Sequence, residues 1–322
     1  MKRVLVVGGA GYIGSHVAWV LQESGYEVRI FDDFSNGLRR RVDGFFTDVV
    51  VGDVLDRKAL TEALSDVGAV IHLAAKKAVG ESVSNPLKYY QHNVGGTLNL
   101  LAGMSAKGVR KLVFSSTAAV YSPSKKESIT EEDETQPLSP YGATKLLSEK
   151  LISEVSKSEG LSSVSLRYFN VVGSSKLEFG DNSKDNLVPK VFAALANGER
   201  PEIYGDDYPT SDGTCIRDYI HVEDIAQAHL FALKATEKAP IDKVYNVGSG
   251  SGYSVREMMN QISKSIGVEL NPKVVGRRDG DTPRLIASTK KIEAELDWRP
   301  KFDLAEMIDS AWAAEKRFGS GN

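Results

Sequence analysis

Two side chains placed four residues apart in this sequence could exchange a proton with a substrate. Tyr141 and Lys145 follow Ser139-Pro140, a suitable N-cap and first residue for a helix. Residues i and i+4 lie on one helix face, so the ammonium group of Lys145 can sit beside the phenol of Tyr141. A phenol has a reference pKa of about 10, and a neighbouring cation lowers that pKa by stabilising the phenolate. The pair could therefore act as an acid and a base near neutral pH.

A run of hydroxyl residues precedes this helix in the sequence. Ser115, Ser116 and Thr117 follow an apolar run that predicts a strand, and ligands bind outside the carboxyl ends of strands in α/β sheets. A hydroxyl there could hold a substrate oxygen while Tyr141 exchanges its proton. Alone, the Tyr-x-x-x-Lys spacing is common by chance and marks a solvated helix face, and three polar residues can simply cap a strand. Their occurrence together beside a cofactor motif favours catalysis.

The cofactor motif is a glycine-rich turn near the N-terminus. Gly8, Gly11 and Gly14 follow the apolar run Val4–Val7 and open a helix expected from about Ile13 to Glu23. Glycines permit a tight turn and the close approach of a pyrophosphate to the backbone, and the helix N-terminus attracts phosphates. A glycine turn that binds nothing would have the same local sequence, so the motif needs support from elsewhere.

Two carboxylates supply that support. Asp32 ends the second predicted strand, about 20 residues beyond the glycines, where a carboxylate can accept hydrogen bonds from a ribose hydroxyl. A 2′-phosphate would meet Asp32 and Asp33 as like charges, so the sequence favours NAD over NADP. Arg39–Arg41 lie nearby and weaken this preference slightly.

The order of elements predicts a Rossmann-type doubly wound parallel sheet with a smaller C-terminal α/β lobe that binds substrate. Short apolar runs alternate with helical segments over the first 120 residues, including a helical stretch at about 86–107. Further strands are expected at Val28–Phe31, Val49–Val51, Ala69–Leu73 and Leu112–Phe114. We divide the chain into a cofactor domain, 1–170, and a substrate lobe, 171–322, although Val164–Leu166 and Val244–Val247 could join the first sheet.

Composition excludes several classes of protein. The 322 residues carry a net charge of −3 with both signs scattered, so no nucleic-acid partner is expected. No apolar stretch approaches the roughly 18 residues of a membrane span, and the N-terminus lacks the features of a signal peptide. The lone cysteine, Cys215, excludes an intrachain disulfide and suits a cytoplasmic setting. The five histidines lack metal-ligand spacing, and His221 reads as a loop and N-cap residue, so we predict no metal.

Longer segments carry a family resemblance. The segments GGAGYIGSH, HLAAKKAVGESVSNPLKYYQHNVGGT, FSSTAAVYS, SPYGATK, RYFN and GDDYPTSDGTCIRDYIHVED resemble the UDP-glucose 4-epimerases, a branch of the extended short-chain dehydrogenase/reductases. The match runs in unchanged order from residue 1 to about residue 300. It implies NAD-dependent interconversion of UDP-galactose and UDP-glucose in galactose metabolism: oxidation at C4, rotation of the 4-keto sugar and reduction on the opposite face. It also implies a homodimer formed by the helices near 86–107 and 140–157.

The resemblance implies a role for individual residues. Tyr141 would be the catalytic acid and base, Lys145 its partner and a cofactor ligand, and Thr117 the hydroxyl that binds substrate. The remaining NAD-binding residues would be Gly8, Gly11, Tyr12, Ile13, Gly14, Asp32, Asp33, Phe34, Ser35, Asn36, Gly37, Asp53, Val54, Leu73, Ala74, Ala75, Lys77, Asn93 and Phe169. The UDP-sugar would contact Asn170, Asn186, Leu187, Tyr204, Arg217, Arg278 and Asp281.

Some positions depart from the commonest family pattern and leave alternatives open. Thr117 stands where serine is frequent, Ser122 replaces a glycine, and Asp185 stands where a second asparagine is common. Leu285 lies where family members differ in bulk beside the sugar 2-position, so a UDP-N-acetylhexosamine or UDP-pentose remains an alternative substrate. A sugar-nucleotide 4,6-dehydratase is disfavoured because Ala118-Ala119 follow Thr117 where dehydratases carry an acid. A non-catalytic dinucleotide sensor is disfavoured because such proteins tend to lose the tyrosine or lysine.

Overall fold

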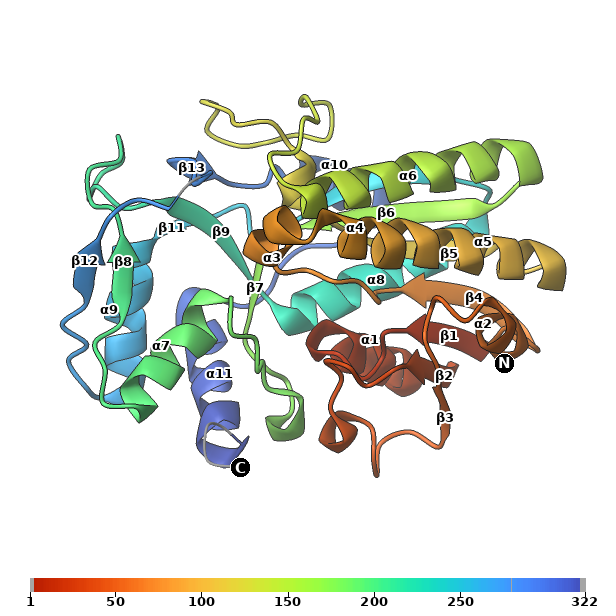
Figure 1. The fold of residues 1–322 in the computed structure, drawn as a ribbon, viewed down its shortest axis with the longest axis horizontal. Helices are drawn as coiled ribbons and strands as arrows, with labels where there is room; N and C mark the ends of the chain where they lie inside the picture. The colour runs from red at the N-terminus through yellow and green to blue at the C-terminus, as the bar shows by residue number, and fades with distance from the viewer. Residues whose placement is uncertain (1–2, 279, 319–322) are drawn as a thin grey trace.

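The computed structural model describes residues 3–278 and 280–318. Its centre is a seven-stranded sheet of order β10-β6-β5-β4-β1-β2-β3, in which every neighbouring pair is parallel (Figure 1). The strands are β1 (Arg3–Val7), β2 (Glu27–Asp32), β3 (Asp48–Val51), β4 (Val67–His72), β5 (Lys111–Thr117), β6 (Ser162–Tyr168) and β10 (Asp242–Val247). The strand order reverses between β1 and β4, which is where doubly wound sheets bind ligands. The predicted fold class is confirmed.

Both faces of this sheet are covered by helices, and apolar residues of its strands pack against them on each face. Val4 and Val6 belong to a core shared with α1 (Tyr12–Glu23) and α8 (Val222–Lys238). Leu5 and Val7 face the opposite core, which α2 (Arg57–Ala63), α5 (Gly96–Lys107) and α6 (Pro140–Glu159) help to form. Successive residues of a strand point to opposite faces, so each strand supplies both cores.

The helical stretch predicted at 86–107 contains a wide turn. Beyond α3 (Val79–Ser84), the chain forms α4 (Pro86–Tyr89), a π-helical turn η2 (Tyr90–Gly95) and then α5. The backbone stays helical through the junctions at Tyr90 and Gly96. Such turns occur often at functional sites, and this one carries Asn93.

The second lobe is built around β9 (Ile216–His221). It pairs antiparallel with β11 (Gly252–Ser254) and parallel with β13 (Arg284–Leu285) and β7 (Asn170–Val172). A separate pair joins β8 (Glu202–Tyr204) to β12 (Lys273–Val275). The helices of this lobe are α7 (Leu187–Ala196), α9 (Val255–Ile266) and α11 (Leu304–Phe318), with α10 (Lys290–Leu296) beside β10.

The two parts of the chain are interleaved. After β9 and α8 the chain returns to the edge of the large sheet as β10, which pairs with β6 over six residues, and then re-enters the second lobe as β11.

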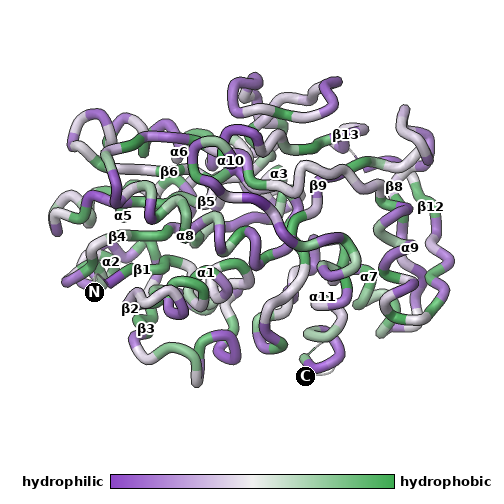
Figure 2. The backbone as a smooth tube through the Cα atoms, turned by 180° about the vertical axis from the view of Figure 1, so that it is seen from behind, coloured by the Kyte–Doolittle hydropathy of each residue, from purple (hydrophilic) through white to green (hydrophobic). Residues whose placement is uncertain are grey.

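Along α9, hydrophilic and hydrophobic residues alternate in Figure 2, and Met258, Met259 and Ile262 form its buried face. Within the described residues, no helix is long and apolar enough to cross a membrane.

Candidate active site

Thr117 and Tyr141 meet where β5 ends and α6 begins. Thr117 is the last residue of β5, and the Ser139 hydroxyl caps α6 by accepting a hydrogen bond from the Gly142 amide at 3.2 Å. A Cβ at Gly142 would overlap the carbonyl oxygen of Ala119, so glycine lets the first turn of α6 approach the strand end. Burial raises the pKa of the Tyr141 phenol, and its hydrogen bond with the Thr117 hydroxyl opposes this by favouring the phenolate.

Lys145 lies one helical turn beyond Tyr141 and is almost fully buried. Its ammonium nitrogen donates to the carbonyl of Ser115 at 2.7 Å and lies 4.8 Å from the centre of the Phe114 ring. Burial lowers the pKa of Lys145 to about 7, with the negative charge of Glu149 acting in the opposite direction. A lysine with this pKa changes charge near neutrality, so its surroundings decide how much cation is available to the phenol.

A cavity lies at the carboxyl ends of β1, β2 and β4. Many of the residues predicted to bind cofactor line it: Gly8, Gly11, Asp32, Asp33, Ser35, Asn36, Gly37, Asp53, Val54, Leu73, Ala74 and Ala75. Phe31, Gly52, Lys76 and His92 line it as well and were not predicted. Gly52 could have been suspected from its place directly after a strand, but Phe31 and His92 offered no signal of their own.

The glycine turn fits a pyrophosphate. Gly8 has φ of 87°, and a Cβ there would lie 2.6 Å from the Ala74 nitrogen; one at Gly14 would overlap the Gly8 carbonyl oxygen. The N-cap of α1 is Gly11, which offers no side-chain cap, and the first turn carries no acidic residue. The N–H groups at this helix end therefore remain available to an anion.

Asp32 holds the cavity wall together from its buried position. Its carboxylate accepts hydrogen bonds from the backbone nitrogens of Ala10 at 2.9 Å and Phe34 at 2.8 Å. Burial raises the pKa of Asp32, and these two N–H groups oppose that shift. The Asp32 carboxylate thus connects the glycine turn to the segment after β2. A ribose of the cofactor would lie at this position.

The other predicted cofactor residues are not among those that line this cavity. The Asn93 amide bonds the backbone of Lys76 in both directions, at 2.9 and 3.0 Å, and donates to the Thr144 hydroxyl at 2.9 Å, which links the cavity to α6. The Tyr12 hydroxyl donates to the Gly173 carbonyl at 2.6 Å. The rest are placed as follows: Ile13 and Gly14 in α1, Phe34 after β2 with a positive φ, Lys77 exposed, and Phe169 buried beyond β6.

Four of the predicted substrate residues form one cluster in the second lobe. Arg217 on β9 bonds Asp281 at 3.1 Å, and the other carboxylate oxygen of Asp281 lies 3.8 Å from Arg278. The guanidinium of Arg278 lies 4.4 Å above the Tyr204 ring. Two cations and an aromatic face are thus collected around a single carboxylate, a donor set suited to a diphosphate and a base.

The remaining substrate candidates lie on two other elements. Asn170 begins β7 and is hydrogen-bonded to Tyr219. Asn186 is the N-cap of α7, donates to the Asp181 carboxylate at 2.6 Å, and is followed by half-buried Leu187.

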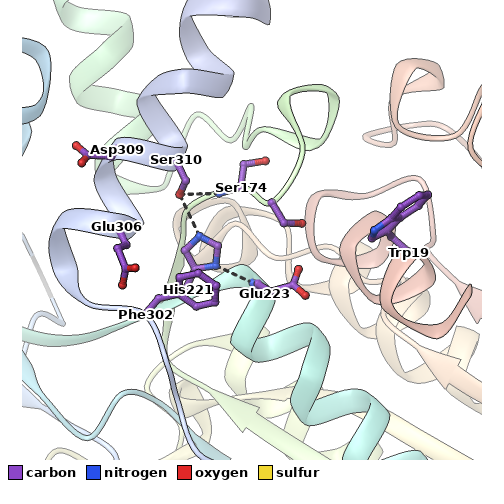
Figure 3. Close-up of a pocket in the computed structure, with 9 residues that line it drawn as sticks. Trp19, Ser174, His221, Glu223, Phe302, Glu306, Asp309 and Ser310 are labelled. Carbon is purple, nitrogen blue, oxygen red and sulfur yellow. Dashed lines mark hydrogen bonds between the residues drawn. The ribbon is translucent and has the colours of Figure 1, made fainter. Parts of the chain in front are cut away.

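A second cavity, of about 630 Å³, lies at the junction of α1, α8 and α11 and contains none of the predicted site residues (Figure 3). His221 stacks on Phe302, with ring centres 4.1 Å apart, and bonds the Ser310 hydroxyl at 3.0 Å. Its other ring nitrogen accepts a hydrogen bond from the Glu223 amide, so His221 caps α8 as predicted. Among the described residues no group of three histidine, cysteine or acidic side chains is placed to hold a metal.

Comparison with known proteins identifies the family. The model of the NAD dependent epimerase/dehydratase family matches residues 4–248. A UDP-glucose 4-epimerase of Corynebacterium glutamicum is 43% identical over 323 residues, covering 98% of this chain and 97% of that protein. The structure of a UDP-glucose-4-epimerase from Stenotrophomonas maltophila, with bound NAD and formylated UDP-arabinopyranose, superimposes with a TM-score of 0.95 at 36% identity over 98% of both chains. A UDP-glucose 4-epimerase from Bifidobacterium longum, in complex with NAD+ and UDP, gives a TM-score of 0.91 at 36% identity, again over 98% of both chains. The chain belongs to the NAD dependent epimerase/dehydratase family.

Proposed function

We propose that this chain is an NAD-dependent epimerase that interconverts UDP-galactose and UDP-glucose. The observation that carries the proposal is the convergence of Thr117, Tyr141 and Lys145 at the end of β5, two strands from the glycine turn after β1. The relatives supply the substrate class, because they are UDP-glucose 4-epimerases whose structures hold NAD with UDP or a UDP-sugar.

The chain's own residues would move a proton at the sugar C4 oxygen. Bound NAD supplies the acceptance of a hydride from C4 and its later return. Tyr141 would take the proton of the 4-hydroxyl and, once the 4-keto sugar has turned, return a proton to the same oxygen, with Thr117 holding that oxygen. Lys145 would keep the phenolate accessible by its positive charge. Lys145 is buried and Thr117 and Tyr141 are half-buried, so the site limits the water that would compete for the proton.

The second lobe would hold the nucleotide while the sugar turns. Arg217 and Arg278 would bind the diphosphate by charge-assisted hydrogen bonds, and Tyr204 would pack against the uracil. Asn170, Asn186, Leu187 and Asp281 would complete this part of the site. Cofactor binding would thus belong mainly to residues 1–170, through the NAD-binding residues named above, and nucleotide binding mainly to residues 171–322.

We also propose a cytoplasmic homodimer acting in galactose metabolism. Leu87, Leu98 and Leu147 project from α4, α5 and α6 with 83%, 54% and 43% of their surface exposed, and Val83 of α3 is 65% exposed. These four helices lie together on one side of the sheet (Figure 1), so their exposed apolar side chains suit a face that a second copy covers. Analytical ultracentrifugation of wild-type and Leu87→Glu protein tests this, since a dimer of the wild type should dissociate in the variant.

The experiment that tests the activity is incubation of purified protein with UDP-galactose, with detection of UDP-glucose by a coupled UDP-glucose dehydrogenase. Conversion is expected, and Tyr141→Phe protein should give almost none. UDP-N-acetylgalactosamine and UDP-arabinopyranose are run in parallel with direct separation of the products. If either of these is turned over faster than UDP-galactose, it is the preferred substrate. Leu285 is then the side chain to substitute.

A further inference from the structure

A buried ion pair joins α6 to β6 directly beyond the catalytic residues. The Arg167 guanidinium bonds both carboxylate oxygens of Glu149, with nitrogen to oxygen distances of 3.0 and 2.6 Å, and the side chains are only 7% and 6% exposed. The Ser116 hydroxyl also donates to Glu149. A two-point interaction of this kind fixes direction as well as distance, so Glu149 is held in one orientation.

The pair is continuous with the site through both α6 and β5. Glu149 lies one turn after Lys145, which itself lies one turn after Tyr141. On β5, the Ser115 carbonyl accepts a hydrogen bond from Lys145, and the hydroxyl of the next residue, Ser116, donates to Glu149. The same strand end therefore aligns two successive turns of the catalytic helix.

The far side of Arg167 is anchored as well. Its guanidinium donates to the Tyr121 hydroxyl at 3.0 Å, and that hydroxyl donates to the Asn246 side chain at 2.6 Å. The Asn246 amide in turn donates to the Ile129 carbonyl at 2.9 Å, and its backbone nitrogen donates to Glu131 at 2.7 Å. Hydrogen bonds from β5, from the loop that follows it and from β10 thus hold the ion pair in place. A movement of Glu149 would disturb this whole network.

We propose that Glu149 is a positioning residue for the epimerase reaction, which aligns α6 on β5 and keeps Lys145 positively charged beside Tyr141. This inference rests on the proposed function. Burial alone drives Lys145 to lose its proton, and the Glu149 carboxylate is the nearby charge that opposes this loss. The other titratable groups near Lys145 are neutral: burial lowers the pKa of His72, at the end of β4, to about 3, and raises the pKa of Tyr141 and of Tyr168 on β6. The positive charge of Arg167 is paired with the carboxylate of Glu149.

The test is the pH dependence of Glu149→Gln protein. The amide still accepts from Ser116 and Arg167 but carries no charge, so Lys145 should lose its proton about one pH unit lower. The alkaline limb of kcat should move down by that amount, which lowers kcat about tenfold at pH 8 and less than about twofold at pH 6, with KM unchanged. Glu154→Gln is the matched control, because Glu154 lies on the same helix and is exposed.

A second readout does not require turnover. The NMR signals of the Lys145 side chain in isotope-labelled protein, assigned by their absence from Lys145→Met protein, should titrate about one pH unit lower in the Glu149→Gln protein than in the wild type. If wild-type protein converts no UDP-sugar, the proposed function fails and this titration still tests the inference. Glu149→Gln/Arg167→Met removes the cation left without its partner, and it should reproduce both shifts.

Two results would overturn the inference. One is a fall in kcat of equal size at every pH with an unmoved Lys145 titration, which would assign Glu149 to stability alone. The other is a double variant whose alkaline limb returns to that of the wild type, which would trace the shift to the unpaired Arg167.

Discussion

Thr117→Val isolates the hydroxyl that bonds Tyr141. Valine has nearly the shape of threonine, so the substitution removes the hydrogen bond and leaves the volume at the end of β5 in place. Thr117 makes a second bond, accepting from the Ala119 amide at 3.2 Å as a helix cap, and loss of that cap costs about 1 kcal/mol of folding stability.

The catalytic effect follows from the charge on the phenolate. A hydrogen bond to a charged group contributes about 1.5–3 kcal/mol, so kcat should fall about 10- to 150-fold. The hydroxyl also opposes the rise that burial imposes on the Tyr141 pKa. Without it that pKa rises further, so the acid limb of the kcat profile should move to higher pH.

The assay is the coupled conversion of UDP-galactose, run from acid to alkaline pH, with thermal unfolding measured on the same samples. Thr117→Ser is the control, because it keeps the hydroxyl and should stay within about threefold of the wild type. A Thr117→Val protein that keeps more than half of the wild-type kcat with an unmoved acid limb would refute the assignment of this hydroxyl to the reacting oxygen.

Three further predictions concern the base, the cofactor and acid stability. Tyr141→Phe should lower kcat at least about 10³-fold, measured by the same assay, while the purified protein keeps its NAD. Gly14→Ala should lose bound NAD, measured by absorbance after denaturation, because the added Cβ overlaps the Gly8 carbonyl. Four buried histidines have pKa values lowered to about 3 or 4: His16, His72, His221 and His229. Their stabilisation is present above the unfolded pKa of about 6.5 and is lost as pH falls, at up to about 2 kcal/mol each by pH 5. Asp218 and Asp224, whose pKa values burial raises to about 6, offset part of this loss, so denaturant unfolding should show lower net stability at pH 5 than at pH 7.

The parts of the fold that could be predicted from sequence are those fixed by local patterns. The strand at Arg3–Val7 and the helix after it are specified by an apolar run, three glycines and an amphipathic segment within about 20 residues. The capped start of α6 is equally local, since Ser139-Pro140 marks it directly. Such signals do not depend on which distant strand becomes the neighbour.

The features that escaped prediction depend on contacts between distant residues. Glu149 and Arg167 are 18 positions apart, and each alone is an ordinary charged residue of a helix or a strand. The need for Gly142 arises from Ala119, across the loop that separates β5 from α6. No local sequence pattern predicts the π turn that carries Asn93. Its role depends on hydrogen bonds of Asn93 with Lys76 and Thr144, which lie far away in the sequence.

The two halves of the site differ in how firmly their polar groups are held, and this difference suits the proposed reaction. Buried Lys145 and half-buried Tyr141 are both hydrogen-bonded to the end of β5, and a group that moves a proton at one defined point must be held in this way. Arg217 and Arg278 instead share Asp281 at the edge of the second lobe, where the side chain of Arg278 is 56% exposed. A diphosphate can replace that carboxylate as the partner of both cations without burying an unpaired charge. In the proposed function the nucleotide would be held through its diphosphate, and the sugar beyond it would remain free to present either face to the same tyrosine.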